Sequence, residues 1–352
     1  MRSKEAYRKS KKMVMPWESS NLFVIILFGV VALGLLVVSA DEVVKRLIRL
    51  AEYFNLSTTF MGMTVVSVAT SIPEISSHLI ASVNILADKI DYRVGSSIVL
   101  GANIGSNVVQ QTLILGIVVL LAGGLYFRRY FLWKSMLPMI VTHVLCIILG
   151  ISGMYSRIDG MILLVSFLAY NYFLYWDERR FYKKEPEQAA TPDAPGTCQA
   201  ALKDALLALA AMSITVISAQ IVLSISERVV EITRVGGSLV GVITLGVASA
   251  LPELMTALAG VKNKDQGISL GTLVGSNITN PLLGVGLGAL ISTYWVPAPL
   301  LQWDLPWEIL TGAILWGILW FTKGKIGRSG SYILMGMYFF YIIARVLFFA
   351  VD

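Results

Sequence analysis

Residues 62–74 read GMTVVSVATSIPE, and residues 241–253 repeat this pattern as GVITLGVASALPE, with Gly, Val, Ala, Pro and Glu at matching places. A second pair of motifs follows in the same order, because residues 101–107 read GANIGSN and residues 271–277 read GTLVGSN. Two motifs that recur in one order indicate an internal duplication. We therefore expect a fold built from two related halves.

Apolar segments surround both motifs. Of the 352 residues, 56% are hydrophobic and only 14% are charged, whereas a soluble domain carries about 25% charged residues. This composition excludes a water-soluble globular protein and predicts an all-α integral membrane protein. Runs long enough to cross a bilayer predict ten transmembrane helices, at residues 22–40, 57–86, 97–122, 135–152, 158–175, 201–223, 237–260, 268–294, 304–322 and 330–350.

A polar stretch rich in charged residues and proline divides the chain at residues 176–200. The predicted organisation is a basic N-terminal tail (1–20), a first membrane repeat with helices 1–5 (21–175), this linker, and a second membrane repeat with helices 6–10 (201–352). Five spans is an odd number, so the second repeat starts from the opposite side of the membrane and the two five-helix repeats are inverted. Secondary transporters have this architecture, with the binding site near the midplane.

Basic residues predict the orientation. Loops on the linker side hold most of the lysines and arginines, which predicts a multi-pass protein of the cell membrane with a cytoplasmic linker and both termini external. The basic tail at residues 1–20 argues for the opposite orientation. The net charge of +6 follows from this topology, so we expect the lipid bilayer as a partner and no nucleic acid.

Glu74 and Glu253 lie deep in apolar spans, where a charged side chain costs at least about 2.5 kcal/mol. Each follows a proline, Pro73 or Pro252, which lacks a backbone N–H and interrupts the helix. Carbonyls freed there, for example near Ser67 and Gly246, can face a cation instead of an amide. The sequence therefore predicts a cation site at each interruption.

Hydroxyl and amide side chains accompany the two glutamates. The first motif adds Thr70, Ser71 and Ser249, and the second adds Ser106, Asn107, Gln110, Ser276, Asn277, Thr279 and Asn280. Oxygen ligands suit calcium, magnesium, sodium or manganese and disfavour zinc and copper. Two carboxylates balance one divalent ion.

Other ionisable residues lie near these motifs or at span ends. His78 lies one helical turn beyond Glu74 on the same face, which leaves open a proton-sensing role or a packing role with a hydrogen bond to a neighbour. Asp204, Asp304 and Glu308 lie near the ends of expected spans, so we expect them at the membrane interface.

At these motifs the sequence resembles the sodium/calcium exchangers of the cation/calcium exchanger superfamily. ATSIPE and ASALPE look like the signatures of the family's two alpha-repeats, and GSNVVQ and GSNITN look like the paired signature on the following helix. The resemblance covers nearly the whole chain. It implies that Glu74 and Glu253 are central calcium ligands, and that other groups complete the calcium and sodium sites: Thr70, Ser71, Ser249, Ser106, Ser276 and the carbonyls near Ser67 and Gly246.

Three positions depart from the family pattern. The family usually has Asn where this chain has Gln110, often has Asp at the position of Asn280, and usually has Ser at that of Ala250. Ala250 removes a hydroxyl and Asn280 cannot ionise. The pocket therefore has two potential negative charges.

The leading functional hypothesis is a secondary antiporter that exchanges sodium for calcium by alternating access. Proton/calcium exchange is an alternative because buried carboxylates readily take protons, and potassium-dependent sodium/calcium exchange is another. A cation channel is a more remote alternative, since pores usually draw on several equivalent subunits. The sequence has no nucleophile signature of an enzyme, and we expect no cofactor, with Ca²⁺ and Na⁺ as transported ions, and no obligatory protein partner.

Overall fold

The computed structural model describes residues 22–53, 62–127, 129–181, 197–262 and 266–352. The predicted tail at residues 1–20 lies outside these ranges, as do residues 182–196 of the predicted linker. The elements of the first half, with η for π-helical segments, are α2 (Leu22–Tyr53), η2 (Gly62–Val66), α4 (Ser67–Thr70), α5 (Ile72–Leu86), α6 (Tyr92–Val109), η3 (Gln110–Ile114), α7 (Leu115–Ala122), β1 (Leu125–Tyr126), α8 (Arg129–Phe131), η4 (Leu132–Met136), α9 (Leu137–Gly150), β2 (Met154–Tyr155) and α10 (Arg157–Phe181).

The second half has nearly the same order of elements. They are α11 (Cys198–Thr233), α12 (Gly237–Gly241), η6 (Val242–Gly246), α13 (Val247–Ser249), α14 (Leu251–Lys262), α15 (Gln266–Thr279), η7 (Asn280–Val285), α16 (Gly286–Ser292), β3 (Tyr294–Trp295), η8 (Leu300–Asp304), α17 (Leu305–Phe321), β4 (Lys325–Ile326) and α18 (Arg328–Phe348). The π-helical segments recur at matching places, which the sequence patterns did not reveal. The duplication of the two motifs therefore extends to secondary structure.

Eight helices in the described ranges are long and apolar enough to cross a membrane. Of the ten predicted spans, the two outside this set are also helical. One is the segment from η2 to α5, interrupted at Ser71, and the other is η8 with α17, which contains Asp304 and Glu308. The protein is an all-α multi-pass membrane protein.

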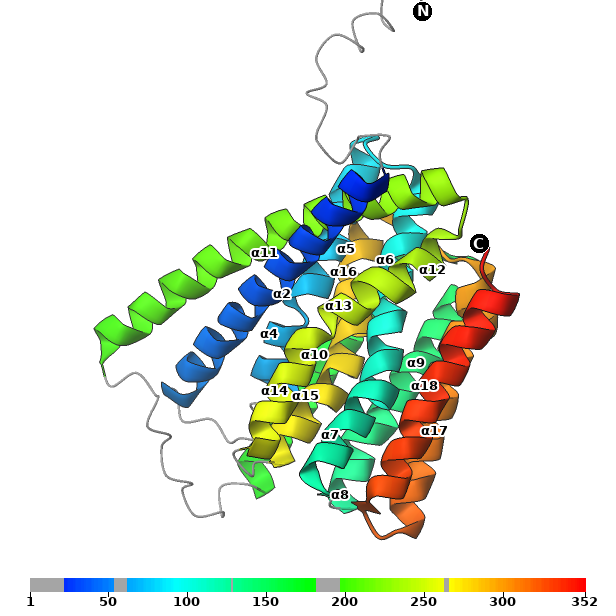
Figure 1. Cartoon of the computed structure of the whole chain (residues 1–352). Helices are drawn as coiled ribbons and strands as arrows, with labels where there is room; N and C mark the ends of the chain where they lie inside the picture. The colour runs from blue at the N-terminus through cyan, green and yellow to red at the C-terminus, as the bar shows by residue number, and fades with distance from the viewer. Residues whose placement is uncertain (1–21, 54–61, 128, 182–196, 263–265) are drawn as a thin grey trace, which may run out of the picture.

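The helices that carry the second motif form the centre of the molecule (Figure 1). The continuous helix of residues 92–122 and that of residues 269–292 are mostly buried, whereas α10 and α18 expose most of their apolar surface. The helices α2 and α11 lie side by side across one flank (Figure 1). Their outer faces are apolar and exposed, as expected for surfaces that contact lipid.

Two short antiparallel sheets join the halves. Strand β1 pairs with β4, and β2 pairs with β3. The helix of residues 129–150 separates β1 from β2, so the two sheets lie at opposite ends of the bundle.

Glycines bring the central helices into backbone contact. A Cβ atom added to Gly101 would lie 2.2 Å from the carbonyl oxygen of Ser238, and one added to Gly241 would lie 2.1 Å from that of Ile98. At a second contact between central helices, a Cβ atom added to Gly275 would lie 2.8 Å from the Cβ atom of Ser67. These glycines therefore allow the central helices to pack closely.

The expectation that Asp204, Asp304 and Glu308 lie at the membrane interface stays a prediction, but their surroundings are more enclosed than the sequence suggested. All three side chains are buried inside the protein. Asp204 pairs with Arg46 at 2.8 Å, and Asp304 pairs with Arg345 at 2.9 Å. The position of these residues near span ends did not reveal their burial, because helices far away in the sequence cover them.

Candidate cation site

Both first motifs contain a helix interruption at matching places. The helix stops at Ser71, between α4 and α5, and at Ala250, between α13 and α14. Glu74 and Glu253 then lie in the first turns of the helices that follow. A helix N-terminus carries partial positive charge, so both interruptions favour a negative group at these positions.

The carbonyl group of Ser67 corrects one expectation from the sequence. It is not free, because it accepts the backbone N–H of Ser71 at 3.0 Å and the hydroxyl of Thr70 at 3.2 Å. The first helix therefore breaks at one residue and does not unwind over the preceding turn. The Oγ of Ser71 has no partner among the described residues.

Glu74 is almost completely buried, with 3% of its surface exposed. Its Oε1 accepts a hydrogen bond from the hydroxyl of Ser106 at 2.7 Å, and Gln110 donates to the same hydroxyl at 3.0 Å. Ser249, from the other half, lies beside the carboxyl group. Oε2 accepts no hydrogen bond from any residue in the described ranges, so this oxygen remains available to a ligand.

Glu253 is fully buried. Neither of its oxygens accepts a hydrogen bond of normal geometry from the part of the chain that the structure describes, although Thr70 and Ser276 lie next to the carboxyl group. Those two hydroxyls are 3.1 Å apart. The two carboxyl groups lie near each other in the same site, so a negative charge on Glu74 disfavours a negative charge on Glu253.

The surroundings of the two glutamates correspond between the halves. Each lies beside the serine of its own second motif, Ser106 or Ser276, and beside a hydroxyl of the opposite first motif. The helices η6 and α6 pass so closely here that a Cβ on Gly246 would lie 3.0 Å from the amide nitrogen of Ser106. The interruptions of both halves therefore meet at one place.

Amide side chains form a buried network around this centre. Asn277 donates to Oε1 of Gln110 at 3.1 Å and accepts from Gln111 at 2.9 Å. Asn280 donates to Oδ1 of Asn107 at 3.0 Å. The network fixes the amide residues predicted for the site, which are Asn107, Gln110, Asn277 and Asn280.

Ser67 lies at the edge of the site, where its hydroxyl is 3.1 Å from that of Thr279 and donates to the carbonyl of Met63 at 2.9 Å. The site residues predicted from the sequence lie on the interrupted helices and the two central ones. Of these, Thr70, Ser106, Ser249 and Ser276 lie directly beside the two glutamates.

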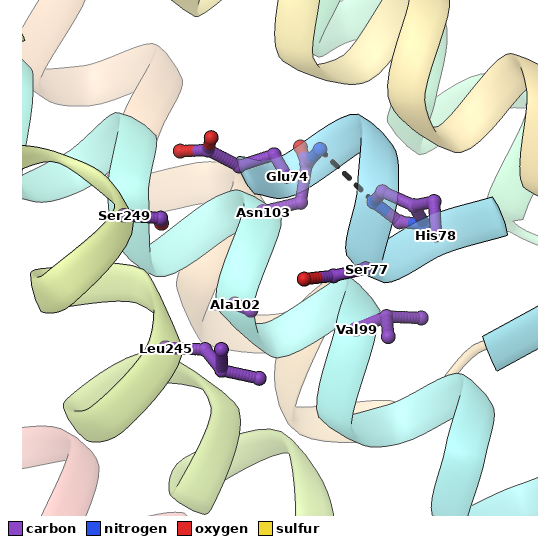
Figure 2. Close-up of a pocket in the computed structure, with 8 residues that line it drawn as sticks. All are labelled: Glu74, Ser77, His78, Val99, Ala102, Asn103, Leu245 and Ser249. Atoms are coloured by element: carbon purple, nitrogen blue, oxygen red, sulfur yellow. Dashed lines mark hydrogen bonds between the residues drawn. The ribbon is translucent and has the colours of Figure 1, made fainter. Parts of the chain in front are cut away.

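A narrow pocket beside Glu74 contains His78 (Figure 2). The carboxylate of Glu74 points away from the imidazole ring (Figure 2). His78 instead contacts Asn103 through Nε2 at 3.1 Å and the Tyr294 hydroxyl through Nδ1 at 3.2 Å. These contacts favour the packing role for this histidine.

Asn103 and Gln111 were not predicted as site residues, whereas Asn107, which lies between them in the sequence, was. Asn103 donates to the carbonyl of Asn280 at 2.9 Å as well as contacting His78. A signal was present in the sequence, because these three amides recur every four residues in an apolar span and so share one helix face.

The arrangement can hold a cation. Burying an unpaired carboxylate costs several kcal/mol. Neither Glu74 nor Glu253 is exposed enough for water to offset this cost. A calcium ion among the carboxyl and hydroxyl oxygens would neutralise both charges, and hard cations prefer such ligands. Oxygens without partners on Glu74, Glu253 and Ser71 fit this use.

The chain is similar to known membrane proteins. The chain is 29% identical over 315 residues to the inner membrane protein YrbG of Escherichia coli, which covers 87% of this chain and 92% of the relative. It is 25% identical over 361 residues to the sodium/calcium exchanger MaX1 of Methanosarcina acetivorans, covering 93% and 98% of the two chains.

The fold resembles that of a solved structure of the sodium-calcium exchanger NCX_Mj, with a TM-score of 0.63, 21% identity, and coverage of 93% of this chain and 99% of the other. The family model described as sodium/calcium exchanger protein matches residues 23–176 and 203–347. Because this match covers most of both halves, the chain belongs to the sodium/calcium exchanger protein family, whose members are membrane transporters of cations.

Proposed function

We propose that the protein is a secondary antiporter that exchanges sodium for calcium, with Glu74 and Glu253 as the central calcium ligands. The observation that carries the proposal is the meeting of two buried carboxyl groups that repel each other and have oxygens without partners. Exclusive occupancy of this site by calcium or sodium supplies the coupling. Calcium and sodium are cargo here, with no resident cofactor.

The surrounding residues have assigned roles in this proposal. The hydroxyls of Ser106 and Ser276 join the calcium site, and sodium sites flank it. The flanking oxygens are the hydroxyls of Ser67, Thr70, Ser71 and Ser249, the carbonyl near Gly246, and the amide oxygens of Gln110 and Asn280. The resemblance to MaX1, named as a sodium/calcium exchanger, supports this assignment.

The proposed architecture is ten spans in two inverted five-helix repeats, at residues 21–175 and 201–352. In the order of elements, β1 of the first half corresponds to β3 of the second, and β2 corresponds to β4. The β1–β4 sheet at one end of the bundle therefore corresponds to the β2–β3 sheet at the other end. That relation supports a repeat axis in the membrane plane. We further propose that the linker at 176–200 is cytoplasmic and both termini are external.

Alternating access requires one part to move against the site. The pair α2 and α11 is suited to this, because it is fastened together by ion pairs from Asp204 to Arg46 and Arg49. The hydroxyl of Thr215 also donates to Ser39 at 2.9 Å. A ligand shifts such an equilibrium only if it interacts differently with the two states, and loading two buried carboxylates meets this requirement.

A second candidate is proton/calcium exchange. It is favoured by Asn280, which cannot ionise where the family often has Asp, and by Ala250, which offers no hydroxyl. The site then has two carboxyl groups that protons can neutralise in place of sodium.

The test is calcium-45 uptake into proteoliposomes loaded with sodium, potassium or buffer alone at set internal and external pH. Uptake that requires an outward sodium gradient is expected. Uptake driven by a proton gradient without sodium would establish the second candidate, and uptake needing both sodium and potassium would establish potassium dependence. Calcium flux without any opposing gradient would indicate a channel and contradict exchange.

A further inference from the structure

Glu308 is a buried acidic residue outside both pairs of sequence motifs. It lies in the first turn of α17 and is fully buried. Neither carboxyl oxygen of Glu308 accepts a hydrogen bond of normal geometry from the described residues. The side chain of Asn107 lies beside this carboxyl group, and its Nδ2 has no hydrogen-bond acceptor of normal geometry among the described residues. A buried carboxylate without a partner costs several kcal/mol, so this group needs a proton or a cation.

His143 faces Glu308 from α9. Its ring is fully buried, with Nε2 3.9 Å from Oε2 of Glu308 and 3.2 Å from the carbonyl oxygen of Asn277. A neutral ring that donates Nε2–H to that carbonyl keeps a lone pair on Nδ1. This nitrogen has no partner in the described part of the chain. The pair therefore offers unused proton acceptors on both members.

The other ionisable groups near Glu308 leave it without a fixed positive charge. Asp304, one turn earlier, is held by Arg345 and by Tyr341. The other ionisable groups near Glu308 are Cys146 of α9 and Tyr155, and neither carries a positive charge. Among the described ion pairs, Glu308 has only His143.

The groups around Glu308 suit a proton better than a metal ion. Calcium and similar hard cations take six or more oxygen ligands. Near Glu308, however, the carbonyl of Asn277 already accepts from His143, and Oδ1 of Asn107 already accepts from Asn280. The groups that remain are an amide N–H and an imidazole ring.

We propose that Glu308 and His143 form a proton-binding site, separate from Glu74 and Glu253 and linked to the cation site through Asn107 and Asn277. With one proton the pair is neutral overall, as a carboxylic acid at Glu308 beside a neutral imidazole at His143. When the proton leaves to solvent, the pair carries one negative charge. No other reactant is required.

The link to the cation site runs through hydrogen bonds. Asn107 contacts Asn280 at 3.0 Å, and Asn277 contacts Gln110 at 3.1 Å. A negative charge at Glu308 attracts a cation to the neighbouring site, so cation binding favours proton release, and protons weaken cation binding by the same factor. This link rests on the proposed function, whereas the proton site itself does not.

The proton site is tested by infrared spectroscopy of the full chain in lipid across a pH series. The spectrum of the wild type minus that of Glu308→Gln should contain one carboxylic acid C=O band that shifts in D2O and gives way to carboxylate bands as pH rises. In His143→Asn this change should occur at a different pH. Glu231→Gln is the control, because Glu231 is an exposed carboxylate paired with Arg228, and its difference spectrum should lack the buried band.

Two results would overturn the proton site. One is the absence of a Glu308 carboxylic acid band at every pH, which means a permanently ionised group. The other is a band that persists unchanged at every pH, which means a permanently protonated structural residue.

The link is tested by adding calcium to purified protein in weak buffer with a pH-sensitive dye, while bound calcium-45 is measured in the same sample. Glu308→Gln should bind calcium but release fewer protons per bound ion than the wild type. Equal release per bound ion would refute the link. If the wild type binds no calcium, the proposed function fails and the link with it, while the infrared titration still decides the proton site.

Discussion

The hydroxyl of Ser106 donates a hydrogen bond to Glu74 at 2.7 Å, whereas the matching Ser276 lies 3.1 Å from Thr70 and leaves Glu253 without a bond of normal geometry. The two halves therefore supply the same residue types in different hydrogen-bonding states. One glutamate is fixed by the protein and the other depends more on what it binds.

Replacement of either glutamate should abolish calcium transport. Glu74→Gln and Glu253→Gln each remove one of the two charges that balance a divalent ion while conserving side-chain volume. Sodium-driven calcium-45 uptake should fall to background in both variants, with elution in size-exclusion chromatography unchanged. The exposed Glu231→Gln serves as control, and retained exchange in both site variants would refute the assigned site.

The two serines should differ in their effect on calcium affinity. Ser106→Ala removes a hydrogen bond to a charged group, which contributes about 1.5–3 kcal/mol, and leaves Oε1 of Glu74 without its donor. We expect calcium affinity to fall about tenfold or more in this variant and less in Ser276→Ala. Calcium-45 binding to both proteins measures the difference, and equal losses would show that the asymmetry has no energetic consequence.

Alanine at Gly101 or Gly241 should destabilise the protein. The added Cβ would press on the backbone carbonyl of Ser238 or Ile98, and overpacking of this kind costs about 1–3 kcal/mol. The melting temperature should drop in a fluorescence-based unfolding assay. Gly317→Ala is the matched control, since nothing lies within 4 Å of its added Cβ, and an equal drop there would contradict the packing argument.

The buried pair of Asp304 and Arg345 should be costly to break. Asp304→Asn leaves the arginine without its counter-charge, and loss of one partner of a buried pair costs about 3–5 kcal/mol. Replacing both residues, as in Asp304→Leu with Arg345→Met, should cost less than Asp304→Asn alone. The same unfolding assay measures both, and a double variant less stable than the single one would speak against this account.

Cross-linking can decide whether α2 and α11 move together. A disulfide between Ser39→Cys and Thr215→Cys, in a Cys198→Ser background, should leave calcium exchange intact because both positions lie on the proposed moving pair. A short bifunctional reagent between Asn84→Cys and Gln220→Cys should stop it, since Asn84 of α5 contacts Gln220 of α11. Inhibition by the first cross-link and not by the second would exclude this motion.

Much of the fold could be predicted from the sequence. Apolar runs predicted the helices, and Pro73 and Pro252 predicted interruptions that the structure has at Ser71 and Ala250, because a residue without an N–H cannot continue the helix ladder. The π-helical segments and the two short sheets were not predictable. They depend on contacts between the halves, such as the pairing of Leu125 with Ile326.

The sequence by itself determined the membrane class, the duplication and the identity of the paired glutamates, because composition and motif spacing are local properties of the chain. Only the tertiary structure decided which oxygens remain without partners and that Glu308 is buried against His143. The physical reason is that burial and hydrogen bonding are set by residues far away in the sequence. Glu308 lies near the end of its span, and helices from both halves enclose it.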